Sequence, residues 1–440
     1  MKLIFDVSDK PKAGQLVVFA LQQMLAILAA TIAVPLIIGN GLTPAAAMFG
    51  AGVGTIVYIL FTKRKSPVFL GSSFAFLGSM AAAFAGGVSM QLGMLGLIVG
   101  AFLAGLVYVV IAIVVKFVGV GWLNKLMPAV VIGPTVAIIG LSLAGNAVGD
   151  LLKGDVTKQV TEYAVSTDSG TPEIIETVSN VPVGSSYVAL ICGLITLAVV
   201  MLCSTYGKKT LRLIPFIIGI LAGYAAAAIF TVIGNICDID ALKIVDFSVF
   251  SSYMLTDGSV SLKTFVSLPD FAFVSGLKGL KEFDFTYFAT IFVAYVPVAL
   301  VVFAEHVADH KNLSSIIDHD LLEEPGLTRT LLGDGVGSIA GALFGGCPNT
   351  TYGESVACVA ITGNASVVTI FAAAVGCMLF SFITPLVAFV DSIPACVMGG
   401  VCIALYGFIA VSGLKMIQDA NLDDNRNLFV VSATAPTNMP

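Results

Sequence analysis

The sequence has very little charge. Only 11% of its 440 residues are Asp, Glu, Lys or Arg, whereas 58% are hydrophobic. A soluble globular domain carries roughly a quarter of its residues as charged side chains. Apolar runs of about 18 residues or more recur along the chain, and runs of that length are typical of membrane-spanning helices. The composition therefore excludes a soluble enzyme and predicts an all-α polytopic membrane protein.

Other absences narrow the function further. The formal net charge is −6, so the chain has no basic surface for a nucleic acid. Its eight cysteines include no CxxC pair, and it has only three histidines and one tryptophan. Because the cysteines lie mostly within or at the ends of apolar spans, a disulfide framework or a thiolate metal site is not expected. Three histidines and one tryptophan are too few for a haem or a multi-histidine metal centre, so we expect no cofactor and no metal. Met1 to Pro11 lack the basic-then-apolar order of a cleaved signal peptide.

Hydrophobic segments divide the chain into twelve predicted spans: 15–38, 44–61, 66–86, 92–116, 126–149, 186–205, 211–236, 286–312, 328–346, 353–363, 365–390 and 394–414. The third and the tenth are poor helices. The third opens with Gly71-Ser72-Ser73-Phe74, and the tenth follows the polar stretch from Gly345 to Gly353. Glycine and small polar residues at membrane depth are typical of interrupted spans that line a protein-enclosed cavity.

The two interrupted spans are seven spans apart, near Ser73 and Gly353. Because seven is odd, equivalent spans cross the membrane in opposite directions. This predicts an inverted repeat with a site between the two broken helices. A first repeat over 15–236 predicts that a second one, starting at 286, reaches roughly residue 507. We therefore expect spans thirteen and fourteen to be missing, after an apolar segment that begins at 427–431.

The distribution of basic residues predicts the orientation. With a cytoplasmic N-terminus, cytoplasmic segments hold 15 of the 21 Lys and Arg residues, including Lys63-Arg64-Lys65 and Lys208-Lys209, and the external side holds 6. The long loops 150–185 and 237–285 then lie outside. This bias follows the positive-inside rule, so we expect the N-terminus in the cytoplasm.

Four carboxylates lie inside or against the apolar spans: Glu305, Asp309, Asp334 and Glu354. Ionisable groups in a membrane are costly, and they usually mark a pathway or a binding site. Glu305 and Asp309 are four residues apart and share a helix face, where they disfavour double ionisation. They are therefore a candidate proton-coupling pair. The alternatives are that Glu305 and Asp309 merely cap the cytoplasmic end of their helix, and that Asp334 terminates a turn.

His306 and His310 are also four residues apart and could be mistaken for a zinc pair. The hydrolytic zinc signature is His-Glu-x-x-His, whereas here the glutamate precedes the first histidine and no third ligand is evident. The simpler interpretation places His310 and Lys311 at the cytoplasmic exit of their helix. The chain also has no nucleophile–base motif, so we do not expect an enzyme.

Three stretches carry a family resemblance: Phe303-Ala304-Glu305-His306-Val307-Ala308-Asp309, Pro348-Asn349-Thr350-Thr351-Tyr352-Gly353-Glu354 and Gly71-Ser72-Ser73-Phe74-Ala75-Phe76. From about Gly14 to Val431 the chain resembles the nucleobase–ascorbate transporters, or nucleobase–cation symporter 2 family, and within it the uracil permease branch. The resemblance implies fourteen spans in two inverted sevens. It also implies secondary active, proton-coupled uptake of uracil across the bacterial inner membrane, and it leaves a homodimer open.

The resemblance implies a core domain and a gate domain. The core would comprise residues 1–125 with spans 1–4 and residues 286–392 with spans 8–11. The gate would comprise residues 126–240 with spans 5–7 and residues 393–440 with span 12, and residues 241–285 would form an external loop.

The resemblance also implies a substrate site. Glu305 and Glu354 would accept hydrogen bonds from the ring N–H groups of the base, and Phe74 and Gly353 would offer backbone N–H groups to its carbonyls. These groups mirror the two N–H donors and two C=O acceptors of uracil. Three further residues would pack around the ring, and three acids would couple protons. The packing residues are Ala30, Ser73 and Tyr352, and the acids are Glu305, Asp309 and Asp334.

Four departures from the family pattern leave xanthine or a broader nucleobase range open. The family's Gln-His on span one is Gln22-Gln23 here, and Asp309, where the uracil branch has histidine, resembles the purine branch. Ser355 and Ala357 stand where the family usually has Asn and Gly, and Thr362-Gly363 stands where it has Thr-Arg. Anion carriers of the same architecture are another alternative, although they favour cationic or neutral residues where Glu305 and Glu354 lie.

Overall fold

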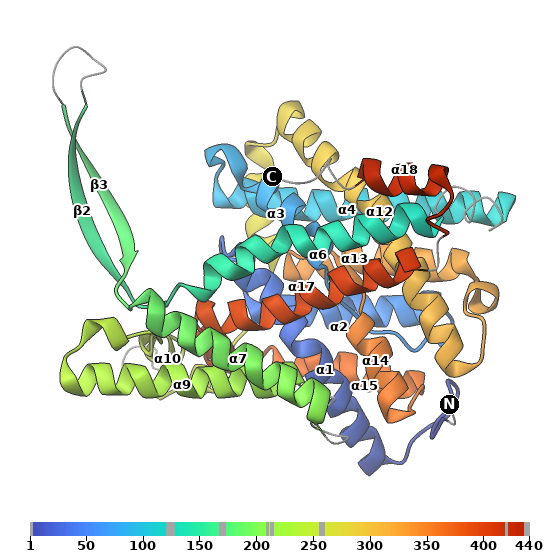
Figure 1. The fold of residues 1–440 in the computed structure, drawn as a ribbon, viewed down its shortest axis with the longest axis horizontal. Coiled ribbons are helices and arrows are strands. Elements are labelled where there is room, and N and C mark those ends of the chain that lie inside the picture. The colour runs from blue at the N-terminus through green and yellow to red at the C-terminus, as the bar shows by residue number, and fades with distance from the viewer. Residues whose placement is uncertain are drawn as a thin grey trace.

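The computed structural model describes residues 3–119, 128–166, 173–207, 211, 215–254, 260–418 and 421–434, so the predicted cytoplasmic pair Lys208-Lys209 lies outside the described residues. Long helices dominate the fold (Figure 1). They are α1 (Ala13–Ile38), α2 (Pro44–Phe61), α4 (Met90–Val118), α6 (Ala129–Leu151), α7 (Ser186–Tyr206), α9 (Pro215–Cys237), α12 (Phe285–Ile317), α13 (Leu327–Gly345) and α17 (Ala395–Gln418). Within the described residues, α1, α2, α4, α7, α9 and α12 are each long and apolar enough to cross a membrane. The predicted polytopic helical class is confirmed.

Both spans predicted to be broken are broken. The first becomes strand β1 (Leu70–Ser72), the 3₁₀ turn η1 (Phe74–Phe76), helix α3 (Leu77–Ala83) and a second 3₁₀ turn η2 (Ala85–Gly87). The other becomes strand β4 (Asn349–Thr351) and helix α14 (Gly353–Thr362). Each strand gives its span an extended segment, whose backbone groups need partners inside the protein.

The predicted span 365–390 is wrong as a single helix. The structure has α15 (Val367–Phe380) and α16 (Thr384–Asp391), and α16 meets the first part of α17 at an angle of 83°. The break coincides with a backbone contact to the external loop, because Thr384 donates its N–H to the carbonyl of Phe265 at 3.1 Å. Proline at the start of α16 also ends the preceding helix, because proline lacks the N–H that would continue it.

The two predicted external loops contain regular structure. In the first, β2 (Thr157–Ser166) and β3 (Glu173–Pro182) pair antiparallel and project from the helical body (Figure 1). The second loop contains η3 (Asp240–Leu242), α10 (Ser248–Met254), η5 (Leu262–Thr264), α11 (Ala272–Gly276) and η6 (Leu277–Lys281). The other short elements are η7 (Leu322–Gly326) and α18 (Asn425–Thr434).

Glycine permits the close approach of α2 and α13. A Cβ on Gly50 would lie 2.4 Å from the carbonyl oxygen of Gly341, and one on Gly54 would lie 2.8 Å from that of Gly337. The two backbones therefore touch directly, which is how small residues hold helices together in a membrane. Gly50 and Gly54 therefore pack α2 against α13.

The helices pack in two groups. In one, α2 contacts α1, α13 and α15, α4 contacts α12 and α13, and α12 contacts α3 and α14. In the other, α17 packs against α6, α7 and α9 (Figure 1). The groups meet where α1 contacts α9 and α17, and where α12 contacts α6.

Asp155, just beyond the end of α6, predicts a pH-dependent stability. Its carboxylate accepts the N–H of Ala395 at the start of α17, at 3.0 Å. Burial raises the pKa of Asp155 to about 6, and nearby Asp246 and Asp150 act in the same direction. Because this pKa exceeds that of the unfolded chain, stability falls as the pH rises from about 4 to about 6. Replacing Asp155 with Asn should therefore lessen the drop in unfolding temperature over that range, measured in detergent. The same change at exposed Asp270 should leave the drop intact; equal slopes in all three proteins would contradict the assignment.

Candidate functional site

The two broken spans meet through a pair of short strands. β1 and β4 run antiparallel, with Leu70 opposite Thr351 and Ser72 opposite Asn349. Each strand leads into a helix, η1 and α3 after β1 and α14 after β4. The antiparallel pairing is the expected result of an inverted repeat, because equivalent spans enter the membrane from opposite sides. The beginnings of η1 and α14 are therefore separated only by the length of this three-residue strand pair.

Phe74 and Gly353, the predicted backbone donors, are the first residues of η1 and α14. The first N–H groups of a helix have no acceptor within that helix, and they lie at the positive end of its dipole. Gly353 is exposed and Phe74 is buried. The Phe74 ring also meets Tyr406 of α17 edge-on, with 5.7 Å between ring centroids. Phe74 thus lies where the two groups of helices touch.

Tyr352, Ser73 and Ala30, the predicted packing residues, are all buried. The Tyr352 hydroxyl donates to the carbonyl of Ser72 at 2.7 Å, which ties the start of α14 to the end of β1. Its ring lies against Gly71, where a Cβ would be only 2.4 Å from two ring carbons. Ala30 belongs to α1, which contacts β1, α3 and α14. These contacts keep the beginnings of both broken helices in one place.

Three of the four membrane carboxylates lie together. Glu305 and Asp309 belong to α12, and Glu354 is the second residue of α14, which packs against α12. All three side chains are half-buried, and Glu305 interacts electrostatically with both Asp309 and Glu354. Since α12 continues to Ile317, about two turns beyond Asp309, the alternative that these acids merely cap the helix end is wrong.

Asp309 is hydrogen-bonded to β4, the strand that leads into α14. The hydroxyl of Thr351, the last residue of β4, donates to Asp309 Oδ2 at 2.8 Å. Thr351 is only 2% exposed, so water does not readily replace this bond. The protonation state of Asp309 is therefore linked by one hydrogen bond to the residue next to Tyr352.

Asp334 lies on α13, within electrostatic range of Glu305 and Asp309. It is fully buried in the middle of α13, so the alternative that it terminates a turn is wrong. Its Oδ2 is 2.6 Å from His306 Nδ1. His310 is also fully buried, with Nε2 at 2.6 Å from the Tyr58 hydroxyl of α2, and the prediction that it lies at the helix exit is wrong. Tyr58 in turn contacts Ser66 Oγ at 2.7 Å.

Two of the four departures from the family pattern contact each other. Gln23, on α1, donates its side-chain N–H to Ser355 Oγ of α14, and Ser355 also accepts the N–H of Phe69 at 3.0 Å. A third departure, Gly363, has a φ of +65°, a conformation that strains any side chain with a Cβ. Its carbonyl accepts the N–H of Ile4 at 2.7 Å. Glycine therefore suits this position, where the N-terminal segment contacts the end of α14.

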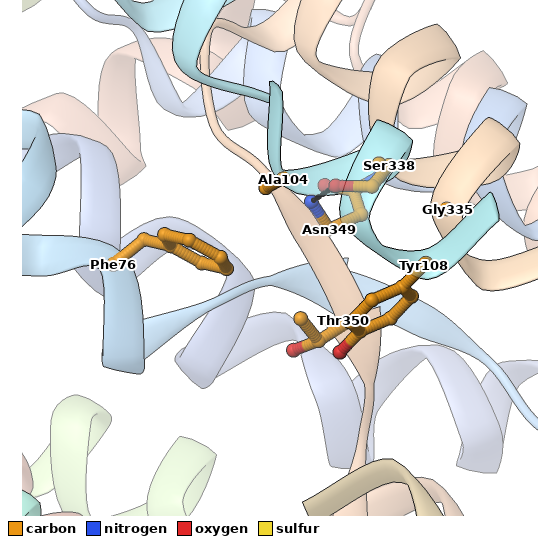
Figure 2. A pocket seen from close by; sticks show the side chains of 8 residues that line it. Phe76, Ala104, Tyr108, Gly335, Ser338, Asn349 and Thr350 are labelled. Carbon is orange, nitrogen blue, oxygen red and sulfur yellow. Dashed lines mark hydrogen bonds between the residues drawn. The ribbon is translucent and has the colours of Figure 1, made fainter. Parts of the chain in front are cut away.

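A small pocket lies beside β4, between α4 and α13 (Figure 2). Asn349 donates its backbone N–H to Ser338 Oγ at 3.0 Å, while the buried Tyr108 hydroxyl has no hydrogen-bond partner among the described residues. Figure 2 shows the hydroxyls of Tyr108 and Thr350 directed toward the same part of the pocket. These groups could hold one ordered water, which needs two to four polar partners. The lining residues are Phe76, Ala104, Gly105, Tyr108, Gly335, Ser338, Asn349 and Thr350.

The sequence analysis missed the polar partners of the acids. Thr351 contacts Asp309 and His306 contacts Asp334, but neither was assigned to the site. Tyr58, which contacts His310, was not assigned either. For Thr351 a signal existed, since it lies in the polar stretch before Glu354. For Tyr58 there was none, because its partner His310 is 252 residues away.

Two interrupted spans that meet through paired strands, beside carboxylates in an otherwise apolar body, define a membrane transporter with its site between broken helices. A family model described as a permease family matches residues 14–436, and the chain belongs to that family, the nucleobase–ascorbate transporters.

The chain is 36% identical to the uracil permease of Bacillus caldolyticus over 98% of its own length and 86% of the relative's. It is 32% identical to the uracil permease of Escherichia coli (strain K12), over 97% of this chain and 85% of the relative. Among solved structures it is similar to the transmembrane domain of a cyanobacterium bicarbonate transporter, BicA. That likeness has a TM-score of 0.62 and 14% identity, and it covers 98% of this chain and 97% of the other, so it shows the fold alone.

Proposed function

We propose that this chain takes up uracil together with a proton across the bacterial inner membrane, with its N-terminus in the cytoplasm. Relatives named uracil permease, 32–36% identical over nearly the whole chain, support this substrate. The observation that carries the proposal is the grouping of Glu305 and Glu354 beside the first N–H groups of α14. This grouping offers acceptors and donors within one site.

The site matches the chemistry of uracil. Carboxylates accept strongly from N–H donors, so Glu305 and Glu354 would bind the two ring N–H groups. The free N–H groups of Phe74 and Gly353 would bind the two carbonyls, with the helix dipole favouring their partial negative charge. Ala30, Ser73 and Tyr352 would surround the ring. Glu305, Asp309 and Asp334 would carry the proton-coupling step.

The two groups of helices would be the core and the gate. Spans α1, α2, α4 and α12, with the broken spans and α13 and α15, would form the core, and α6, α7, α9 and α17 the gate. Alternating access needs one bundle to rock against the other. Such rocking would change the contact between the rings of Phe74 and Tyr406, which lies beside the proposed substrate site.

Asp309 supports xanthine as a second candidate substrate, because an acid at this position resembles the purine branch. An anion such as bicarbonate is disfavoured, since Glu305, Asp309 and Glu354 would repel it. Titration calorimetry of the purified protein with uracil, xanthine and bicarbonate separates these cases. Heat from uracil supports the proposal, heat from xanthine alone moves the substrate to the purines, and heat from bicarbonate alone would refute it.

Replacing Asp309 with Asn should flatten the pH dependence of uptake more than it weakens binding. Asp309 lies beside Glu305 and is bonded to Thr351 rather than placed at the helix end. The measurement is initial uptake of labelled uracil between about pH 5 and 8, with binding measured in parallel. A variant with the native pH profile would show that Asp309 does not carry the coupled proton.

Replacing Thr351 with Val should lower uptake about tenfold or more, because a donor to a carboxylate contributes about 1.5–3 kcal/mol. Replacement with Ser keeps the hydroxyl and should restore most of the uptake. Both variants are measured in cells at equal protein levels. If Val and Ser behave alike, the bond from Thr351 to Asp309 has no part in transport.

A further inference from the structure

His306 and Asp334 form a buried pair that is separate from the substrate carboxylates. His306 is 1% exposed and Asp334 is 0% exposed, and His306 Nδ1 lies 2.6 Å from Asp334 Oδ2 across the contact between α12 and α13. Glu305 precedes His306 in the chain, but successive side chains diverge by about 100° around a helix. Glu305 is half-buried, whereas His306 is fully buried. The pair therefore has no direct access to a substrate.

Thr330 determines which nitrogen of His306 carries a proton. The Thr330 hydroxyl lies 3.1 Å from the Leu327 carbonyl oxygen and 3.1 Å from His306 Nε2. A hydroxyl has one proton and a carbonyl only accepts, so the Thr330 proton goes to Leu327. Nε2 must then donate to the Thr330 oxygen. In a neutral imidazole with its proton on Nε2, Nδ1 is an acceptor.

Since Nδ1 faces Asp334 Oδ2 at hydrogen-bond distance, a further proton must lie between them. A lone pair against an ionised carboxylate would be repulsive at 2.6 Å. The other oxygen, Asp334 Oδ1, has no hydrogen-bond partner among the described residues. An unpaired oxygen is tolerated far better on a neutral carboxyl than on a buried charge. That proton can belong to Nδ1, as an imidazolium beside a carboxylate, or to Asp334, as a neutral carboxyl, and both satisfy the contact. The unpaired Oδ1 and the burial favour a protonated Asp334 that donates to His306.

The opposite assignment has Thr330 donating to Nε2 and Nδ1–H donating to an ionised Asp334. It leaves the Thr330–Leu327 contact without a proton, and it places a net negative charge in a sealed region. The ionisable groups around the pair are Tyr58 on α2, Tyr108 on α4, and Glu305, Asp309 and His310 on α12. His310 donates from Nδ1 to the His306 carbonyl and accepts the Tyr58 hydroxyl at Nε2, so it is neutral, and none of the others is a cation that would offset the charge.

We propose that His306 and Asp334 together bind one proton, as a second proton site distinct from Glu305 and Asp309, and that Thr330 sets its tautomer. In the proposed function, on which this role in coupling rests, loss of that proton would set a carboxylate against a lone pair and loosen α12 from α13. Since α12 carries Glu305, the pair would then act on the substrate site through helix position. Proton occupancy itself is a property of the resting protein and does not depend on transport.

The test is nitrogen NMR of the purified protein, labelled with ¹⁵N in its histidine rings. The chain has only three histidines, His306, His310 and His319, so the spectrum contains three rings with two nitrogen signals each. His310 donates from Nδ1 to the His306 carbonyl at 2.7 Å, and therefore has the opposite tautomer to His306. Single replacements of His306 and of His310 with Gln assign the signals. We expect His306 in the Nε2–H form and His310 in the Nδ1–H form.

Infrared spectra of the same unmutated protein supply the second readout. A protonated-carboxyl band at neutral pH that is missing from Asp334→Asn supports the proposal. Thr330→Val should weaken that band and Thr330→Ser should keep it. An Nδ1–H form of His306 together with no such band would overturn the proposal. Neither readout uses uracil or a gradient, so a chain that fails to transport uracil would still give a clear answer.

Discussion

Replacing Glu305 with Gln is expected to raise the dissociation constant for uracil by about one to two orders of magnitude. The carboxylate accepts from a ring N–H with the strength of a charge-assisted bond, whereas the amide oxygen of Gln accepts only as a neutral group. The Glu305 side chain lies on α12 within electrostatic range of Glu354 and Asp309. Calorimetry on the purified variant measures the effect directly.

Glu323→Gln is the matched control, because Glu323 is exposed in the turn that follows α12. It removes the same charge outside the site and should leave the affinity unchanged. The unfolding temperature of Glu305→Gln should stay close to that of the unmutated chain. Unchanged affinity in a folded Glu305→Gln protein would remove this residue from the binding site.

Replacing Gly71 with Ala is expected to abolish most uptake. The new Cβ would lie 2.4 Å from two ring carbons of Tyr352 and 2.9 Å from its hydroxyl oxygen. The ring cannot yield without breaking the hydrogen bond from Tyr352 to the Ser72 carbonyl. Overpacking of this kind costs about 1–3 kcal/mol. The clash would displace Tyr352 and the adjacent Gly353 from the proposed site. The affinity for uracil should therefore fall together with the stability.

Gly78→Ala provides the comparison within the same broken span. Gly78 belongs to α3, and a Cβ there would meet nothing within 4 Å. Alanine also favours the helix over glycine by about 1 kcal/mol, so this variant should be at least as stable as the native chain. Uptake and unfolding temperature are measured for both variants, and both quantities should be lower in Gly71→Ala than in Gly78→Ala. If Gly71→Ala retains native uptake, the packing of Tyr352 against β1 is not required for function.

The architecture was largely predictable because a membrane-spanning chain needs long apolar segments, which are visible in the sequence. Apolar length predicted the long helices, and the polar stretches at Ser73 and Gly353 predicted two broken spans, since exposed backbone at that depth must face a cavity. The offset of seven spans from one broken span to the other is odd and predicted an inverted repeat, and β1 and β4 pair antiparallel. The break near Ile383 had one sequence signal, Pro385 at the start of α16, but its contact to Phe265 in a distant loop could not be predicted.

The sequence singled out the membrane carboxylates but not the residues that contact them. The cost of placing a carboxylate in a membrane singled out Glu305, Asp309, Asp334 and Glu354. Spacing along one helix related Glu305 to Asp309, but no spacing relates Asp334 to His306 across two helices. Their contact depends on the rotation of α12 against α13. Family resemblance also recorded Gln23 and Ser355 as separate departures, whereas the structure joins them by a hydrogen bond.

Uptake of labelled uracil into liposomes that contain only the purified protein tests the central proposal most directly. With the interior more alkaline than the exterior, we expect uracil to accumulate, and we expect a protonophore to collapse the accumulation. Glu305→Gln should show none, and Glu323→Gln should match the unmutated chain. No accumulation with an imposed proton gradient, from a preparation that binds uracil, would contradict proton-coupled transport.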